Sequence, residues 1–337
     1  MDTRMMLKKN GRSDIQSSFL ANVKSRLPEH VSFPDELAEL LKISRDSAYR
    51  RIREETIMSL DEVRILCDRY NVSVDSLMGR EAGHVSFELS AQTGPGIQFK
   101  GWMESMLKHL QRLAACPGSE MTWHSKDLPI FHYFQFPRLA AFKLYWWMKL
   151  SSGEDFGKQP FDEKLIGRDL IALGEKIWDT YSRISSTEII SRELINTTLR
   201  QIEYTADGGY LTRDQAAALC QDCTDLVRRL QRQTQQGYKG VEDSPEQGGR
   251  SNVYLNELLI GDNTLLFQAG QKLTTYITHN NFNIISTGNE SFCAQTAQFM
   301  KFLIQKSVLI SRVAEKERVK FFNRIYKQIE DCDFQLI

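Results

Sequence analysis

The sequence predicts an all-α N-terminal domain of five short helices and a larger α+β domain, in which helices accompany an antiparallel β-meander. Three observations predict this organisation. The chain has 337 residues, which is too long for one ordinary hydrophobic core. Apolar residues recur at helical spacing in the first part of the chain. In four later segments, apolar and polar residues instead alternate with a period of two, and turn sequences join these segments.

Helix start and stop signals divide the N-terminal part into five expected helices. They cover residues 17–28, 32–43, 44–55, 59–70 and 73–78. Pro28 ends the first helix, and Ser32 and Ser44 are placed to cap the second and third. Ser59 and Glu62 form a capping box for the fourth. The connections are brief, so the sequence predicts a small helical bundle.

The second and third helices have the spacing of a helix-turn-helix. Ala38 is the small residue that allows the two helices to approach, Ile43 is the apolar residue of the turn, and Ser44 begins the next helix. This arrangement resembles the helix-turn-helix domain of the lambda repressor and Cro family, which many bacterial regulators contain. The resemblance covers about residues 13–80 and implies a DNA-binding domain.

Two residues depart from the pattern of that family. Lys42 stands where the family usually has glycine, so we expect a modestly strained backbone with positive φ at this position. Arg51 stands where the family commonly has an apolar residue, and we expect the neighbouring Ile52 to supply that packing.

Positive charge is concentrated on the third expected helix, although the formal net charge of the chain is zero. Residues 42–53 hold five basic residues and one acidic residue. The N-terminal part of a recognition helix faces base edges in the major groove. The expected base-reading residues are Arg45, Asp46, Ser47, Tyr49 and Arg50. The expected phosphate contacts, which provide affinity without sequence choice, are Lys42, Arg51 and Arg53.

Composition predicts a cytoplasmic protein without membrane contact. A hydrophobic share of 41% and a charged share of 26% are those of a soluble globular protein. No apolar run approaches the roughly 20 residues that cross a bilayer, and the N-terminus shows no signal peptide. The six cysteines lack framework spacing, so we expect free thiols in a reducing compartment.

The expected domain boundaries follow from shifts in composition. The helix-turn-helix domain is assigned residues 1–80, a linker residues 81–98, and the larger domain residues 99–337. A short alternating run within the linker is a candidate strand. Within the larger domain, the polar, Gly-rich segment at about 235–252 is expected to be a flexible loop.

The larger domain is expected to begin with helices and to continue into the meander. Its expected helices cover residues 99–116, 164–184, 186–205, 212–233, 289–307 and 313–332, and another follows Pro137. The four expected meander strands cover residues 253–260, 264–269, 272–279 and 282–287. Cys220 and Cys223 form a CxxC inside a helix, which indicates packing rather than metal binding. The last helix is expected to cap the meander or to pair across a dimer.

Residues 121–150 form the densest aromatic stretch of the chain and have two interpretations. In the first, the aromatic side chains fill the core. In the second, they line a pocket for a small molecule. The candidate pocket residues are Trp123, His124, His132, Tyr133 and Trp146.

These observations favour a sequence-specific transcriptional regulator whose larger domain senses a signal, holds a dimer, or does both. The expected partners are double-stranded DNA, a second copy of the chain and a small-molecule effector. We expect no cofactor, metal or enzymatic activity, since the sequence shows no Walker loop, dinucleotide fingerprint or HExxH. One alternative is an enzyme with an autoregulatory DNA-binding head and chemistry near His124, Asp127 and His132. Another is a protein-interaction scaffold.

Overall fold

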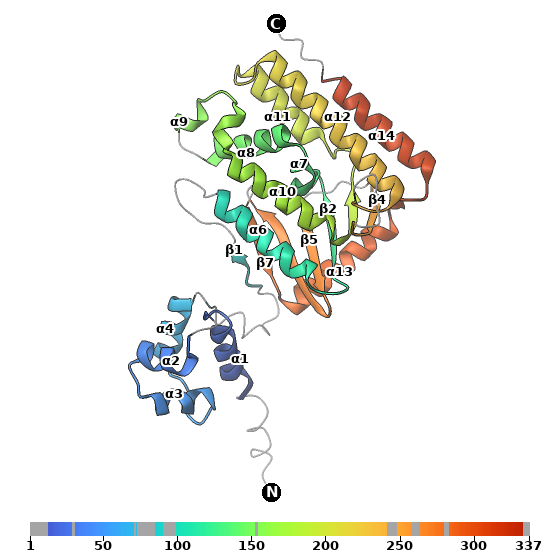
Figure 1. Cartoon of the computed structure of the whole chain (residues 1–337). Helices are drawn as coiled ribbons and strands as arrows, with labels where there is room; N and C mark the ends of the chain where they lie inside the picture. Colours follow the sequence, from blue (N-terminus) through green and yellow to red (C-terminus); the bar gives the residue numbers. More distant parts are fainter. Residues whose placement is uncertain are drawn as a thin grey trace. The chain divides into compact units, whose positions relative to one another are not determined.

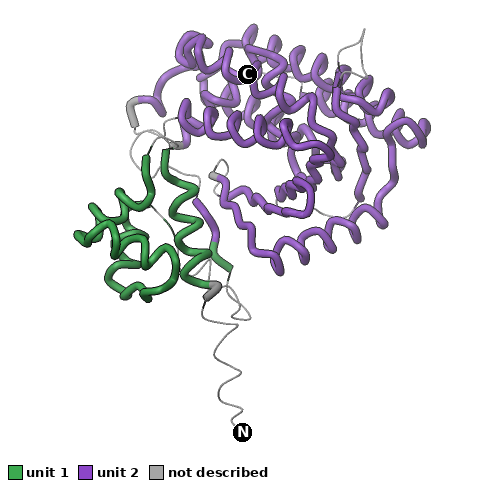
Figure 2. The backbone as a smooth tube through the Cα atoms, turned by 60° about the horizontal axis from the view of Figure 1, so that its bottom comes forward, with its two compact units in different colours: residues 1–86 green, residues 87–337 purple. Residues whose placement is uncertain are grey.

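Two units with separate hydrophobic cores make up the chain. The computed structural model describes residues 13–28, 31–70, 72, 85–89, 99–151, 154–240, 248–257, 263–279 and 283–332. Unit 1 comprises Met1–Ser86 and unit 2 comprises Phe87–Ile337 (Figure 2). The division therefore lies inside the segment that the sequence assigns to a linker.

Unit 1 contains the helices α1 (Ser13–Lys24), α2 (Phe33–Leu41), α3 (Arg45–Ile52) and α4 (Leu60–Tyr70). Their buried side chains form one small core, which consists of Phe19, Leu20, Val23, Phe33, Leu37, Ala48, Met58, Leu66 and Val72. The expected fifth helix, residues 73–78, lies outside the described residues. The described part of unit 1 is helical, as predicted.

The predicted helix caps are formed at two of three positions. The Ser44 hydroxyl accepts the backbone N–H of Ser47 at 3.2 Å. Ser59 and Glu62 form the reciprocal capping box, with N···O distances of 2.9 and 3.3 Å. Ser32 occupies the N-cap of α2 with extended backbone, but its side chain makes no capping hydrogen bond. Local sequence therefore defines the starts of α3 and α4.

Unit 2 is built on a mixed sheet of eight strands in the order β1-β7-β6-β5-β2-β3-β4-β8. The strands are β1 (Glu88–Leu89), β2 (Glu120–Ser125), β3 (Ser185–Ile190), β4 (Ser251–Leu255), β5 (Thr264–Ala269), β6 (Lys272–His279), β7 (Asn283–Thr287) and β8 (Val308–Leu309). β2, β3 and β4 run parallel to one another, whereas all other pairs are antiparallel. Unit 2 is therefore an α+β unit.

Two sequence predictions about this sheet are wrong. The expected four-strand meander is a three-strand meander of β5, β6 and β7, because β4 pairs in parallel with β3 and antiparallel with β8. Residues 185–190 were expected to belong mostly to a helix, yet they form β3, whose last five residues are all buried. A strand that is covered on both faces has no alternating pattern, so it resembles a helix segment in sequence.

Helices cover the two faces of the sheet unequally (Figure 1). They are α6 (Phe99–Ala114), α7 (Ile130–Tyr133), α8 (Pro137–Ser151), α9 (Glu154–Gly157), α10 (Arg168–Ser182), α11 (Asn196–Asp207), α12 (Arg213–Gln236), α13 (Glu290–Gln305) and α14 (Glu315–Glu330), with a 3-10 turn at Glu163–Ile166. Most of them share one large core with Met121 and Val253 of the sheet. By contrast, Cys293 and Met300 of α13 form a separate small cluster with Leu266.

The last helix packs on another helix rather than on the meander. Phe322 and Ile325 of α14 are buried in the large core, and the Tyr326 hydroxyl donates to Gln231 Oε1 of α12 at 2.8 Å. The prediction that this helix caps the meander is therefore wrong. In Figure 1, α14 runs beside α12.

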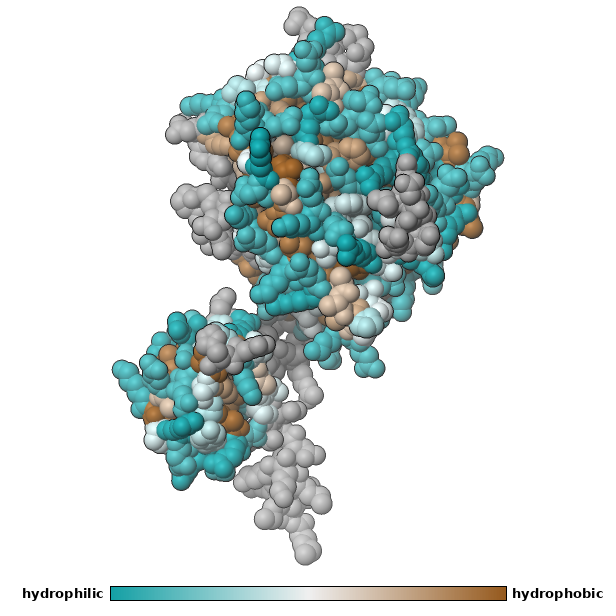
Figure 3. All heavy atoms as spheres, viewed as in Figure 1, coloured by the Kyte–Doolittle hydropathy of each residue, from teal (hydrophilic) through white to brown (hydrophobic). Residues whose placement is uncertain are grey.

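The expected loop at 235–252 is shorter than predicted. α12 extends to Gln236 and β4 begins at Ser251, and Tyr238 forms an isolated antiparallel bridge with Arg250. Only residues 241–247 of this segment lie outside the described residues. The face of unit 2 seen in Figure 3 is largely hydrophilic, with scattered apolar residues. Among the described helices, none combines the length and the apolar character needed to span a bilayer.

Candidate nucleic-acid interface

The turn between α2 and α3 has the backbone geometry that the sequence predicts. Lys42 adopts φ 54° and ψ 44°, a left-handed conformation that costs a non-glycine residue about 1–2 kcal/mol. Its N–H donates to Glu39 O at 3.2 Å, and the N–H of Ile43 donates to Ala38 O at 3.0 Å. These bonds end α2 and redirect the chain, which sets the angle at which α3 begins.

The two faces of α3 have different surroundings. Ala48 is fully buried, and Ile52 packs against the core of unit 1, as expected. On the opposite face Arg45, Asp46, Tyr49 and Arg50 are exposed. Lys42 before the helix and Arg53 after it are also exposed. A cation-rich surface therefore extends along the outer face of α3.

Each exposed arginine of this surface has a carboxylate neighbour. The ion pairs are Arg45–Asp35 at 2.9 Å, Arg50–Asp46 at 3.1 Å and Arg53–Glu55 at 3.4 Å. All six side chains are at least 50% exposed. Such pairs contribute only about 0–1 kcal/mol. Exchange of these carboxylates for phosphate or guanine acceptors is therefore energetically cheap.

Ser47 and Arg51, two of the expected DNA contacts, make bonds within unit 1. The Ser47 hydroxyl lies 2.9 Å from that of Ser44, so it belongs to the cap of α3. The Arg51 guanidinium holds Glu62 through three contacts of 2.6–3.2 Å and donates to Ser47 O at 3.2 Å. The Arg51 and Glu62 side chains are only 15% and 16% exposed. Arg51 therefore fastens α3 to α4 and is largely withdrawn from solvent.

Sequence reasoning missed the two side chains that hold the end of α3. The Gln16 amide on α1 donates to the carbonyl groups of Arg51 and Thr56, each at 2.9 Å, and accepts the N–H of Met58 at 3.0 Å. Glu62 was recognised only as a cap, whereas it also pairs with Arg51. Nothing local signals either contact, because the partners lie 11 to 42 residues apart.

Arg51→Ala is expected to lower the stability of unit 1 by about 1–3 kcal/mol, because it leaves the half-buried Glu62 carboxylate without its partner. Hydrogen bonding by Arg51 lowers the pKa of Glu62 below its usual value. Hydrogen exchange of α3 and α4 amides in the full chain measures the loss.

The matched control for Arg51→Ala is Arg64→Ala. Arg64 also lies on a unit 1 helix and faces a carboxylate, Asp68 at 3.9 Å, but both side chains are about 70% exposed. Equal exchange rates in the two variants would contradict the fastening role of Arg51.

The candidate pocket residues of unit 2 lie in several separate environments. Trp123 and His132 are buried around Tyr181, with ring centroids 6.4 and 5.6 Å from it. His124 contacts Phe299 of α13 at 5.7 Å. Trp146 is half-buried against Tyr204 at 5.5 Å. Their contact with an effector remains a prediction.

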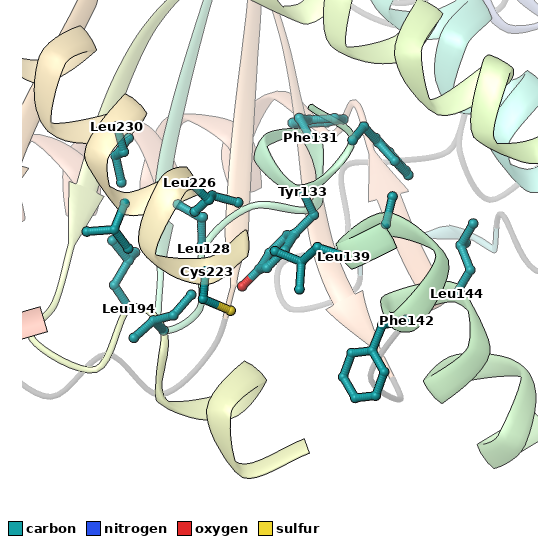
Figure 4. Packing of buried hydrophobic residues seen from close by; sticks show 14 of the residues in the cluster. Leu128, Phe131, Tyr133, Leu139, Phe142, Leu144, Leu194, Cys223, Leu226 and Leu230 are labelled. Atoms are coloured by element: carbon teal, nitrogen blue, oxygen red, sulfur yellow. The ribbon is translucent and has the colours of Figure 1, made fainter. Parts of the chain in front are cut away.

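Tyr133 lies deep in the large core. Its hydroxyl is 2.6 Å from that of Thr198, and its ring lies 5.0 Å from Lys143 Nζ. Figure 4 shows the Tyr133 hydroxyl next to Cys223 of α12. Cys223 is itself fully buried, so the CxxC cysteine nearest Tyr133 serves packing, as the sequence indicates.

The three residues of the enzymatic alternative have different partners. His132 Nε2 is 3.5 Å from a carboxylate oxygen of Glu188, whereas Asp127 accepts the Thr197 hydroxyl and His124 contacts Phe299. Within the described residues, no group of three or more His, Cys, Asp or Glu side chains is arranged to hold a metal ion. No protein-family model, curated protein or solved structure matches the chain.

Proposed function

We propose that the chain is a sequence-specific DNA-binding transcriptional regulator that reads duplex DNA with α3. The observation that carries the proposal is the left-handed turn at Lys42 between α2 and α3, combined with the cation-rich outer face of α3. A helix presented in this way fits the major groove, which is about 12 Å wide.

The exposed residues of α3 divide into two roles. Arg45 and Arg50 are assigned to guanine edges, where a bidentate guanidinium contact distinguishes bases. Asp46 and Tyr49 lie beside them on the same face. Lys42 and Arg53, at the two ends of the helix, are assigned to phosphates, which set orientation and affinity.

The proposal includes a homodimer, because one helix-turn-helix contacts few phosphates and two half-sites bind far more tightly. Unit 2 is assigned the roles of holding the dimer and responding to a small-molecule effector. Such a ligand acts only if its affinity differs between two arrangements of the reading heads. The free thiols of all six cysteines support a cytoplasmic location.

In vitro selection from a random pool of duplex DNA tests the proposal. The expected product is an enriched palindrome whose half-sites are about 10 base pairs apart, since paired helix-turn-helix domains read successive turns of one groove. A pool that remains random after selection would count against DNA binding. Capture of one protein in its place would favour the scaffold alternative.

Salt dependence separates the phosphate contacts from the base contacts. Lys42→Asn and Arg53→Gln are each expected to reduce the slope of log affinity against log salt by about 0.9, the value for one phosphate contact. Asparagine tolerates the left-handed backbone at position 42. Fluorescence anisotropy of labelled duplex at several salt concentrations measures the slope. Arg64→Gln on α4 is the control, and a similar change in that variant would refute the assignment.

A further inference from the structure

Three ionisable side chains are buried together inside unit 2. His132 comes from α7, Glu188 from β3, and Lys239 from the segment after α12, and each is only 2% exposed. Ionisable groups are rarely buried so completely unless they are paired. The three residues are distant in sequence, so only the assembled fold brings them together.

Glu188 is held as a carboxylate by donors on both of its oxygen atoms. Oε1 accepts the hydroxyl groups of Tyr181 at 2.7 Å and Ser186 at 2.9 Å. Oε2 lies 3.5 Å from Nε2 of His132. Burial raises the pKa of Glu188, but His132, the charge of Lys239 and the Tyr181 hydroxyl together lower it to about 2. The cluster therefore contains one permanent negative charge near neutral pH.

Lys239 is the member of the cluster whose ammonium lacks a hydrogen bond. Among the described residues, no acceptor lies within bonding distance of its Nζ, which is 3.7 Å from the centroid of the Tyr181 ring. Its backbone is held, because its N–H donates to Gly249 O at 3.0 Å and its carbonyl accepts the Gln233 amide at 3.1 Å. Burial lowers the pKa of Lys239 to about 7, although the charge of Glu188 acts in the opposite direction.

Within the described part of unit 2, aromatic side chains contact the cluster. β2 contributes the indole of Trp123, and α10 contributes Trp178 and Tyr181, which contact the His132 ring. On α12, the Arg229 guanidinium lies 6.0 Å from the Trp178 ring. Among the described residues, Glu188 supplies the negative charge that acts on Lys239, so the buried Lys239 ammonium depends on this one carboxylate for compensation.

We propose that the His132–Glu188–Lys239 cluster is a proton-binding site that makes the folding of unit 2 respond to pH near neutrality. Lys239 binds its proton more weakly in the folded chain than in the unfolded chain, where its pKa has the usual value of 10.5. From about pH 7 upward the unfolded chain therefore holds more protons, and the free energy of unfolding rises with pH. Acidification toward pH 7 removes this stabilisation. The inference does not depend on DNA binding.

Urea unfolding of the full chain between pH 6.5 and 8 tests the proposal. The five tryptophans, Trp102, Trp123, Trp146, Trp147 and Trp178, all lie in unit 2, so their fluorescence reports this unit alone. The unfolding constant is expected to fall with pH, approaching a factor of about 10 per unit for one proton. Phenols stay protonated throughout this window, and thiols, whose ordinary pKa is about 8.5, begin to ionise only toward its upper end.

Lys239→Met is expected to lose most of this pH dependence and to be more stable than the unchanged chain at pH 6.5. Lys176→Met, at an exposed position of α10, is the control and should retain the slope. Lys143→Met is measured separately. Burial lowers the pKa of Lys143 to about 8, so this residue adds to the pH dependence of the unfolding free energy at the upper end of the window.

An unchanged slope in Lys239→Met, or lower stability than the unchanged chain at pH 6.5, would overturn the proposal. Should Lys239→Met fail to fold, proton uptake on unfolding of the unchanged chain decides the question. This uptake is obtained at pH 7.5 from the heats of unfolding in two buffers with different ionisation enthalpies. Net uptake supports the proposal, and zero uptake or net release rejects it.

Discussion

Replacing Arg45 and Arg50 together with alanine is expected to weaken binding of the selected duplex by at least about 30-fold, because each bidentate guanine contact is worth about 1–3 kcal/mol. Both guanidinium groups are exposed, and their present carboxylate partners are exposed as well. Breaking these exposed ion pairs therefore costs little free energy when the two arginines enter the groove. Fluorescence anisotropy at one fixed salt concentration measures the change.

Sequence preference provides the sharper readout of the same variant. Removing base contacts is expected to relax discrimination at the positions assigned to Arg45 and Arg50, whereas removing phosphate contacts weakens binding to all sequences alike. Arg64→Ala, which also breaks an exposed ion pair on a helix of unit 1, is the matched control. If the double variant retained the wild-type affinity and base preference, α3 would not be the reading helix.

Glu188→Ala is expected to lower the free energy of unfolding of unit 2 by about 3–5 kcal/mol, the cost of removing one partner from a buried charged pair. The substitution leaves the hydroxyl groups of Tyr181 and Ser186 without their acceptor. It also leaves His132 without its carboxylate contact and Lys239 without the negative charge that favours its protonated form. Tryptophan fluorescence during urea unfolding measures the loss.

Two further variants show whether a loss of stability comes from the buried carboxylate. Glu175→Ala removes an exposed carboxylate from α10 and is expected to change stability by less than about 0.5 kcal/mol. Glu188→Gln preserves the shape and an acceptor oxygen, so its effect should lie between the two. If Glu188→Ala and Glu175→Ala changed the free energy of unfolding equally, the buried carboxylate would not stabilise unit 2.

Local signals predicted most of the described part of unit 1. The capping groups of Ser44 and Ser59 act within three residues of their own positions, so they are legible in sequence. The left-handed backbone at Lys42 was likewise foreseeable from the turn. The role of Arg51 was not, because its partner Glu62 comes from the next helix.

In unit 2 the sequence predicted the hairpin-linked strands but not the sheet around them. β5, β6 and β7 are consecutive and are joined by short turns, so their pairing is local. β3 and β4 join the sheet through parallel contacts between segments more than sixty residues apart. β3, whose last five residues are all buried, shows no alternation and was predicted as helix. β4 alternates and was predicted as a strand, but its parallel pairing with β3 had no local signal.

The amino-acid sequence by itself determined the helical character of the described N-terminal unit, the position of its turn, and the concentration of cations near α3. These properties depend on neighbouring residues, whose spacing is directly visible. Only the tertiary structure decided that Arg51 is the cation withdrawn from solvent. It also decided that β3 pairs with β4 and that His132, Glu188 and Lys239 meet in one core. Burial and pairing between distant segments depend on how the chain packs, and packing has no local pattern in sequence.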